Sequence, residues 1–161
     1  MTSFLEILGL HRELDELFLL HQEALLERDL GRALELFRRH RAAVQRHSQD
    51  EERELLPLYA SVPRERRQAA EVFVQEHQRL HELLERIEAL LLASFERPLE
   101  ARAILHLIER EASYKHLFEH HDQRERTQLF PALDELVPEG QRAAILARIS
   151  FQPLGVSESA G

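Results

Sequence analysis

The stretch HSQDEERELLP, residues 47–57, returns later in the chain as HDQRERTQLFP, residues 121–131. Both copies carry His, Gln, Glu, Leu and Pro at the same offsets, in the frame H-x-Q-x-E-x-x-x-L-x-P. Residues four apart lie on one face of a helix, about 6 Å from each other. His47 with Glu51 and His121 with Glu125 are therefore predicted to form two equivalent pairs of an imidazole and a carboxylate. Such pairs are suited to binding adjacent metal ions.

The composition favours helices and excludes several kinds of site. Gly (5) and Pro (6) are scarce among the 161 residues, and there is no Cys to form a disulfide, a zinc ribbon or a cysteine-held iron–sulfur cluster. Any metal must then be bound by imidazole and oxygen. The chain has 10 His, spread from His11 to His121, which is an unusually high number.

Charge and hydropathy narrow the choice of partners. The net charge is −8, with Arg interspersed among Glu, which argues against a nucleic-acid surface. The N-terminus MTSFLEILGL has no basic signal region, and no apolar run approaches the ~20 residues of a membrane span. We therefore expect a soluble, cytoplasmic protein without a nucleic-acid or membrane partner.

Apolar residues recur at helical spacing along most of the chain, so we expect an all-α fold. Ser3 with Glu6 predicts a capping box, Asp29 can cap the next helix, and Pro57 and Pro131 are expected to end or kink the helices that contain them. The expected helices cover residues 3–28, 29–59, 64–93 and 99–133. They predict an up-down-up-down four-helix bundle over residues 1–137. Residues 138–161 are expected to form a short fifth helix, at 139–149, and a flexible tail.

The spacing of the histidines from the turns predicts that they meet. Antiparallel neighbours place residues that are equidistant from their turn at similar heights. His11 and His47 each lie 18 residues from the first turn, so they should face each other. The same reasoning brings His77 to the level of His47 and His121 close to it. His81, one turn after His77, adds a second ligand on the third helix.

The predicted layer of five imidazoles and two carboxylates matches a dinuclear metal site. Burying these groups unpaired would cost several kcal/mol for each carboxylate, which a metal pair removes. With a bridging oxo or hydroxo group, they fill all but one position of two octahedral iron ions. An open position on a redox metal in an apolar pocket suits O2, NO or peroxide. Fe/Mn or Zn fits the same ligand types.

Four motifs, in order along the chain, give the sequence a resemblance to the hemerythrin family, and specifically to bacterial HHE cation-binding domains. LHRELDEL (10–17) and EHQRLHELL (76–84) resemble the motifs of its first and third helices, and the repeated stretches resemble those of its second and fourth. The resemblance spans about residues 4–136 and implies a non-haem di-iron centre. It implies that one iron binds His77, His81 and His121 and the other His11 and His47, with Glu51 and Glu125 bridging. The second iron would hold the open position.

The subtype within this family is mixed. Oxygen carriers have an Asp five residues after the fourth-helix His, whereas this chain has Arg126 there and Glu125 one residue earlier. The Glu125 spacing resembles the iron–sulfur-repair branch, which often has a Cys-bearing N-terminal segment and lacks the histidine found here as His81. Because the predicted ligand set is rich in His and leaves one open position, we expect O2 binding or sensing. The alternatives are a stress enzyme that reduces NO or peroxide or donates iron for cluster repair, and an interaction module that signals through its C-terminal segment.

Several other residues near the predicted layer allow more than one interpretation. Tyr114, two turns before His121, either lines the ligand pocket or packs in the core. His120 is an alternative to His121, and His21 an alternative to His11, although His21 lies too near the first turn to reach the layer. The remaining expectations are a polar pair or solvent exposure for His40, surface positions for His106 and His116, and a solvated Glu52.

Overall fold

A computed structural model of the chain describes residues 2–66 and 68–149, and every regular element among them is helical. The α-helices are α1 (Leu8–Leu26), α2 (Leu30–Asp50), α3 (Leu56–Tyr59), α4 (Ala70–Ala93), α5 (Ala101–Arg124), α6 (Phe130–Leu136) and α7 (Glu139–Arg148). Short 3-10 helices cover Phe4–Ile7, Arg64–Arg66 and Ser94–Glu96, and π-helical turns cover Glu51–Leu55 and Glu125–Leu129. None of the described helices is both long and apolar enough to span a bilayer.

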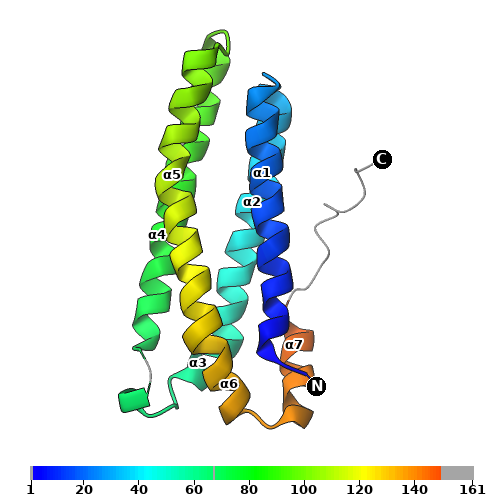
Figure 1. Cartoon of the computed structure of the whole chain (residues 1–161), viewed down its shortest axis with the longest axis vertical. Helices are drawn as coiled ribbons and strands as arrows, with labels where there is room; N and C mark the ends of the chain where they lie inside the picture. The colour runs from blue at the N-terminus through cyan, green and yellow to red at the C-terminus, as the bar shows by residue number, and fades with distance from the viewer. Residues whose placement is uncertain (1, 67, 150–161) are drawn as a thin grey trace.

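The four long helices form the predicted bundle, in which α1 packs against α2 and α5, and α4 packs against α5 and α2 (Figure 1). The helices α2 and α5, which carry the repeated stretches, are therefore diagonal to each other. Ser3 and Glu6 form the expected capping box, and the Asp29 carboxylate accepts a hydrogen bond from the Arg32 N–H at 3.0 Å. Between α1 and α2, Arg28 adopts a left-handed conformation with φ of 62°.

Two helix limits differ from the prediction. The third long helix starts at Ala70 rather than at Arg64, because Ala69 has an extended backbone (ψ 136°). If the helix began at Arg64, the arginines of the run RERR would lie at its N-terminus, where the helix dipole disfavours positive charge. With the observed start, Glu71 lies in the first turn of α4, where the dipole favours negative charge. The fourth helix is not ended by Pro131, since the chain stays helical to Leu136. The expected tail, residues 150–161, lies outside the described residues.

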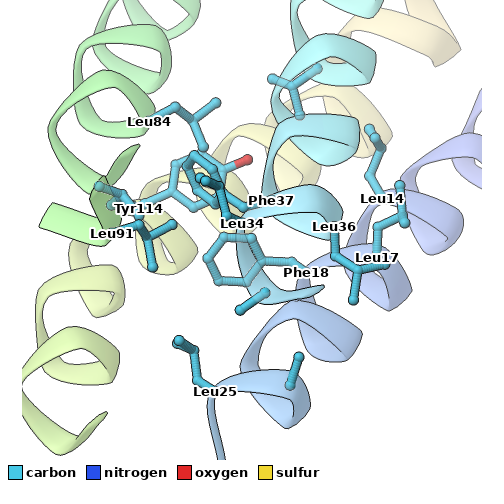
Figure 2. Packing of buried hydrophobic residues seen from close by; sticks show 14 of the residues in the cluster. Leu14, Leu17, Phe18, Leu25, Leu34, Leu36, Phe37, Leu84, Leu91 and Tyr114 are labelled. Atoms are coloured by element: carbon cyan, nitrogen blue, oxygen red, sulfur yellow. The ribbon is translucent and has the colours of Figure 1, made fainter. Parts of the chain in front are cut away.

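The apolar interior divides into two clusters along the bundle. The larger one fills the half nearer the two turns that join α1 to α2 and α4 to α5, where side chains such as Phe18, Phe37 and Leu84 meet (Figure 2). The smaller one lies among the 3-10 helix Phe4–Ile7, α3, α6 and α7, and includes Phe130 and Leu146. The fifth helix, α7, is present as predicted and closes this end of the bundle beside the N-terminus (Figure 1).

Candidate metal centre

The repeated stretches adopt the same local structure, a π-helical turn that begins at the glutamate. The turns cover Glu51–Leu55 and Glu125–Leu129, and the residue after each turn bonds back to the glutamate carbonyl five residues earlier. The proline that follows then lies in the first turn of the next helix, a position at which a missing N–H is tolerated. The shared frame therefore encodes a His/Glu pair, a π-helical turn, and a proline that is compatible with the turn and with the helix that follows it. π-Helical turns of this kind are frequent at functional sites.

Six polar side chains from the four long helices and the two turns meet in the bundle interior, each 5% exposed or less. They are His11, His47, Glu51, His77, His121 and Glu125. They form two overlapping groups in which the ligand atoms lie within 4.8 Å of one another, and both glutamates belong to both groups. We call the group with His11 and His47 the α1/α2 half, and the group with His77 and His121 the α4/α5 half.

Each glutamate directs one oxygen to each half. Glu51 Oε1 lies 3.1 Å from His47 Nε2, and Glu51 Oε2 lies 3.2 Å from His77 Nε2. Glu125 repeats the pattern, with its two oxygens 3.2 Å and 2.7 Å from the Nε2 atoms of His11 and His121. Two carboxylates arranged in this way are placed to bridge two metal ions.

Three of the four imidazole rings are oriented by a carboxylate from a different helix. In each case the ring Nδ1–H donates a hydrogen bond to the carboxylate. The pairs are His11 with Asp122 at 2.5 Å, His77 with Glu52 at 2.8 Å, and His121 with Glu76 at 2.8 Å. Carboxylates of this kind fix the tautomer of a metal-binding histidine and raise its basicity.

Nitrogen and oxygen atoms that can accept a hydrogen bond or bind a metal gather at short distances inside the cluster. With the proton on Nδ1, the lone pair of a neutral imidazole is on Nε2, which here points into the cluster. The Nε2 atoms of His11 and His47 lie only 2.8 Å apart, and carboxylate oxygens lie beside both. Acceptor atoms at these distances need either a shared proton or a metal cation between them. The arrangement therefore fits bound metal ions.

Buried atoms without a hydrogen-bond partner give a second test of this fit. Glu51 Oε1, both carboxylate oxygens of Glu125, and His47 Nδ1 have none among the described residues. A buried, unpaired carboxylate costs several kcal/mol, and metal ions would satisfy the three oxygens. The donor set of nitrogen and oxygen atoms thus suits a dinuclear metal site.

The two glutamates have opposite protonation tendencies. Burial and the neighbouring Glu51 carboxylate raise the pKa of Glu125 well above its usual range. Burial also acts to raise the pKa of Glu51, but His47 and His77 hold it well below its usual range. A bound cation would favour the ionised form of Glu125, so metal ions and protons would compete for this carboxyl group.

Of the seven predicted ligands, His81 is the one outside both groups. It is half-buried, one turn after His77, and burial together with His77 lowers its pKa. Tyr114 is 1% exposed and its hydroxyl bonds to His40 rather than to one of the six clustered side chains. Its role at the pocket stays a prediction. His120 is exposed, and its ring lies next to that of His116 instead of in the cluster.

A second set of buried histidines lies in the other half of the bundle. His21 is fully buried, with Nε2 2.6 Å from Glu111 Oε1 and Nδ1 2.8 Å from the Ala33 carbonyl. Gln22 donates to the other Glu111 oxygen at 2.8 Å. His40 is also buried, and it is not paired with His21. Neither histidine belongs to a group of potential metal ligands among the described residues.

The sequence did not reveal the roles of Asp122, Glu52 and Glu76. Glu52 is partly solvated, as expected, with a side chain 41% exposed, but it also orients His77. A signal was present, because each of the three acids is the immediate neighbour of a proposed ligand in the sequence. An adjacent residue lies about 100° around the helix, at the flank of the site, from where its side chain reaches the next helix.

Comparison with known families agrees with this geometry. The hemerythrin HHE cation-binding domain matches residues 6–133, which include all six clustered side chains. Comparisons with curated proteins and with solved structures gave no match. Since the match covers most of the chain, the protein belongs to the hemerythrin HHE cation-binding domain family.

Proposed function

We propose that the protein holds two iron ions, one in each half of the cluster, with Glu51 and Glu125 bridging them. The observation that carries this proposal is the placement of the glutamate oxygens, one towards each half. His81 is proposed as a third nitrogen ligand of the α4/α5 half, because it lies one turn beyond His77. The α1/α2 half would then have fewer ligands than the other.

We further propose that the centre binds O2, or a related small molecule such as NO or peroxide, for oxygen binding or sensing. When bound, two iron ions supply electrons and a position at which such a molecule is held. The protein contributes three rings oriented by carboxylates and an interior in which the six clustered side chains are 5% exposed or less. His11 lies between aromatic rings of both apolar clusters, with Phe118 and Phe130 at centroid distances of 6.3 Å and 6.1 Å. A nitrogen-rich ligand set favours reversible binding over oxygenase chemistry more than a carboxylate-rich one does.

The test begins with the iron content of protein purified from iron-supplied cells. We expect about two iron ions per chain, as in dinuclear sites. After reduction, admission of O2 should produce a charge-transfer absorption band that disappears when O2 is removed. His47→Ala should lose iron and the band, whereas the matched control His106→Ala, which alters an exposed histidine outside the cluster, should keep both. Irreversible oxidation without such a band would refute reversible binding.

The second candidate function is a di-iron stress enzyme that reduces NO or peroxide, or that donates iron for iron–sulfur cluster repair. It is favoured by the position of Glu125, one turn after His121, which equals that of Glu51 after His47. Steady-state consumption of NO or H2O2 by the iron-loaded protein, lost in Glu125→Ala, would support this alternative. Absence of turnover would leave reversible binding as the better account.

A further inference from the structure

A groove of about 560 Å³ runs between α1 and α5 on the side of the bundle where His11 lies. Its rim is exposed and charged, and includes Asp15, Lys115 and Glu119. Its inner wall is aromatic, formed by side chains such as Phe18 and Phe118 that are 7% exposed or less. The groove therefore leads from solvent to the aromatic interior.

The floor of this groove is uncharged and internally hydrogen-bonded. His40 Nδ1–H donates to the Leu14 carbonyl at 2.9 Å, so its Nε2 is left to accept the Tyr114 hydroxyl at 2.6 Å. Burial lowers the pKa of His40 to about 3 and raises that of Tyr114 well above its usual range, so both are neutral near pH 7. Because these groups satisfy each other, the floor does not require ordered water. Such a surface suits a small, uncharged and weakly polar molecule.

The inner end of the groove adjoins the α1/α2 half of the cluster. Asp122 lines the groove and also accepts the hydrogen bond from His11 Nδ1 at 2.5 Å. Phe118 lines it as well, and its ring centroid lies 6.3 Å from that of His11. Phe118 and Asp122 thus line the groove and also lie beside His11.

We propose that the α1–α5 groove is the path by which a small, uncharged molecule reaches the α1/α2 half, and that Phe118 is the side chain that moves to admit it. This inference rests on the proposed function. It adds a direction of approach. It also predicts that anions are disfavoured, since three acids (Asp15, Glu119 and Asp122) outnumber two basic residues (Lys115 and Arg126) around the groove.

A second groove serves as a matched control. It lies between α4 and α5, has a similar volume of about 610 Å³, and none of the six clustered side chains or their orienting carboxylates lines it. Three arginines, Arg79, Arg86 and Arg110, line it instead. A substitution there changes a groove on the same bundle without obstructing the proposed path.

The first experiment is independent of oxygen chemistry. Crystals of zinc-loaded protein are pressurised with xenon, an uncharged apolar atom. We expect a xenon site in the α1–α5 groove beside Phe118. This site should be lost in Leu19→Trp, which replaces an exposed aliphatic side chain of the rim with a large indole ring. Xenon bound only elsewhere, or absent, would overturn the proposal. Since zinc is redox-inactive, this result does not depend on whether the iron protein binds O2.

The second experiment measures the association rate of NO with the reduced, iron-loaded protein by stopped flow. Leu19→Trp and Phe118→Trp should each slow association about tenfold, a change of the size that steric gating produces, while the affinity changes less. Leu83→Trp, in the α4–α5 groove, should leave the rate unchanged. Equal association rates in the wild type and all variants would refute the proposed path through the α1–α5 groove. If the protein binds xenon in this groove but binds neither NO nor O2, only the proposed function is refuted.

Discussion

Replacing Glu76 with Gln removes the charge that orients His121 while preserving the shape of the side chain. Glu76 Oε2 accepts the His121 Nδ1–H at 2.8 Å, and Oε1 accepts the Arg124 Nε–H at 2.8 Å. Burial acts to raise the pKa of Glu76, but His121 and Arg124 hold it below its usual value, so the carboxylate is ionised at neutral pH. A Gln can accept at one of the two positions, and its NH2 group then faces the donor at the other.

Loss of such an orienting carboxylate typically weakens metal binding about 10- to 100-fold. At about 1.4 kcal/mol per factor of ten, this corresponds to about 1.4 to 2.7 kcal/mol. The affinity for Zn²⁺ or Co²⁺ is measured by competition with a coloured chelator, which requires no redox chemistry.

The control is Glu88→Gln on the same helix. Glu88 is similarly exposed (15% against 13%) and also accepts from two basic groups, Arg38 and Arg41, but it lies away from the cluster. Its substitution should leave metal affinity unchanged. If Glu76→Gln bound metal as tightly as the wild type, or if both variants lost affinity equally, orientation of His121 by Glu76 would be refuted.

Three further predictions concern stability, measured by urea unfolding of zinc-loaded protein. Since the pKa of His40 falls from 6.5 in the unfolded chain to about 3 when folded, the unfolded state binds the extra proton between these values. His40 should therefore make stability fall by up to about 1.4 kcal/mol per unit as pH drops below 6.5, and His40→Gln should remove that contribution; an unchanged slope would contradict it. Glu111→Ala leaves the buried His21 and Gln22 without their acceptor, and should cost about 3–5 kcal/mol, whereas a loss below about 1 kcal/mol would show that the pair is not needed. Arg28→Gly relieves the left-handed backbone and should stabilise the fold by about 1 kcal/mol; destabilisation would contradict this.

The sequence predicted the bundle and the meeting of six side chains because both follow from regular helix geometry. A spacing of four residues fixes which His and Glu share a face, and distance from a turn fixes their height in antiparallel helices. His11 and His47 meet across α1 and α2 with a ring distance of 4.8 Å, as the equal distances from the turn predicted. Neither argument needs to know how the side chains pack.

Features that depend on side-chain reach or on local deformation were not predictable in this way. The π-helical turns add a residue to the helix register, so that Pro131 falls at a helix start instead of ending the helix. Asp122 orients His11 from another helix, a contact that no spacing within one helix specifies. The same holds for His21, whose burial is made possible by Glu111, a residue 90 positions away.

The most direct test of the dinuclear centre is anomalous diffraction at the iron absorption edge from crystals of the iron-loaded protein. The account predicts two anomalous peaks about 3.5–4 Å apart, one in each half of the cluster, with Glu51 and Glu125 contacting both. A single peak, or no peak between these side chains in protein shown by metal analysis to contain iron, would contradict it.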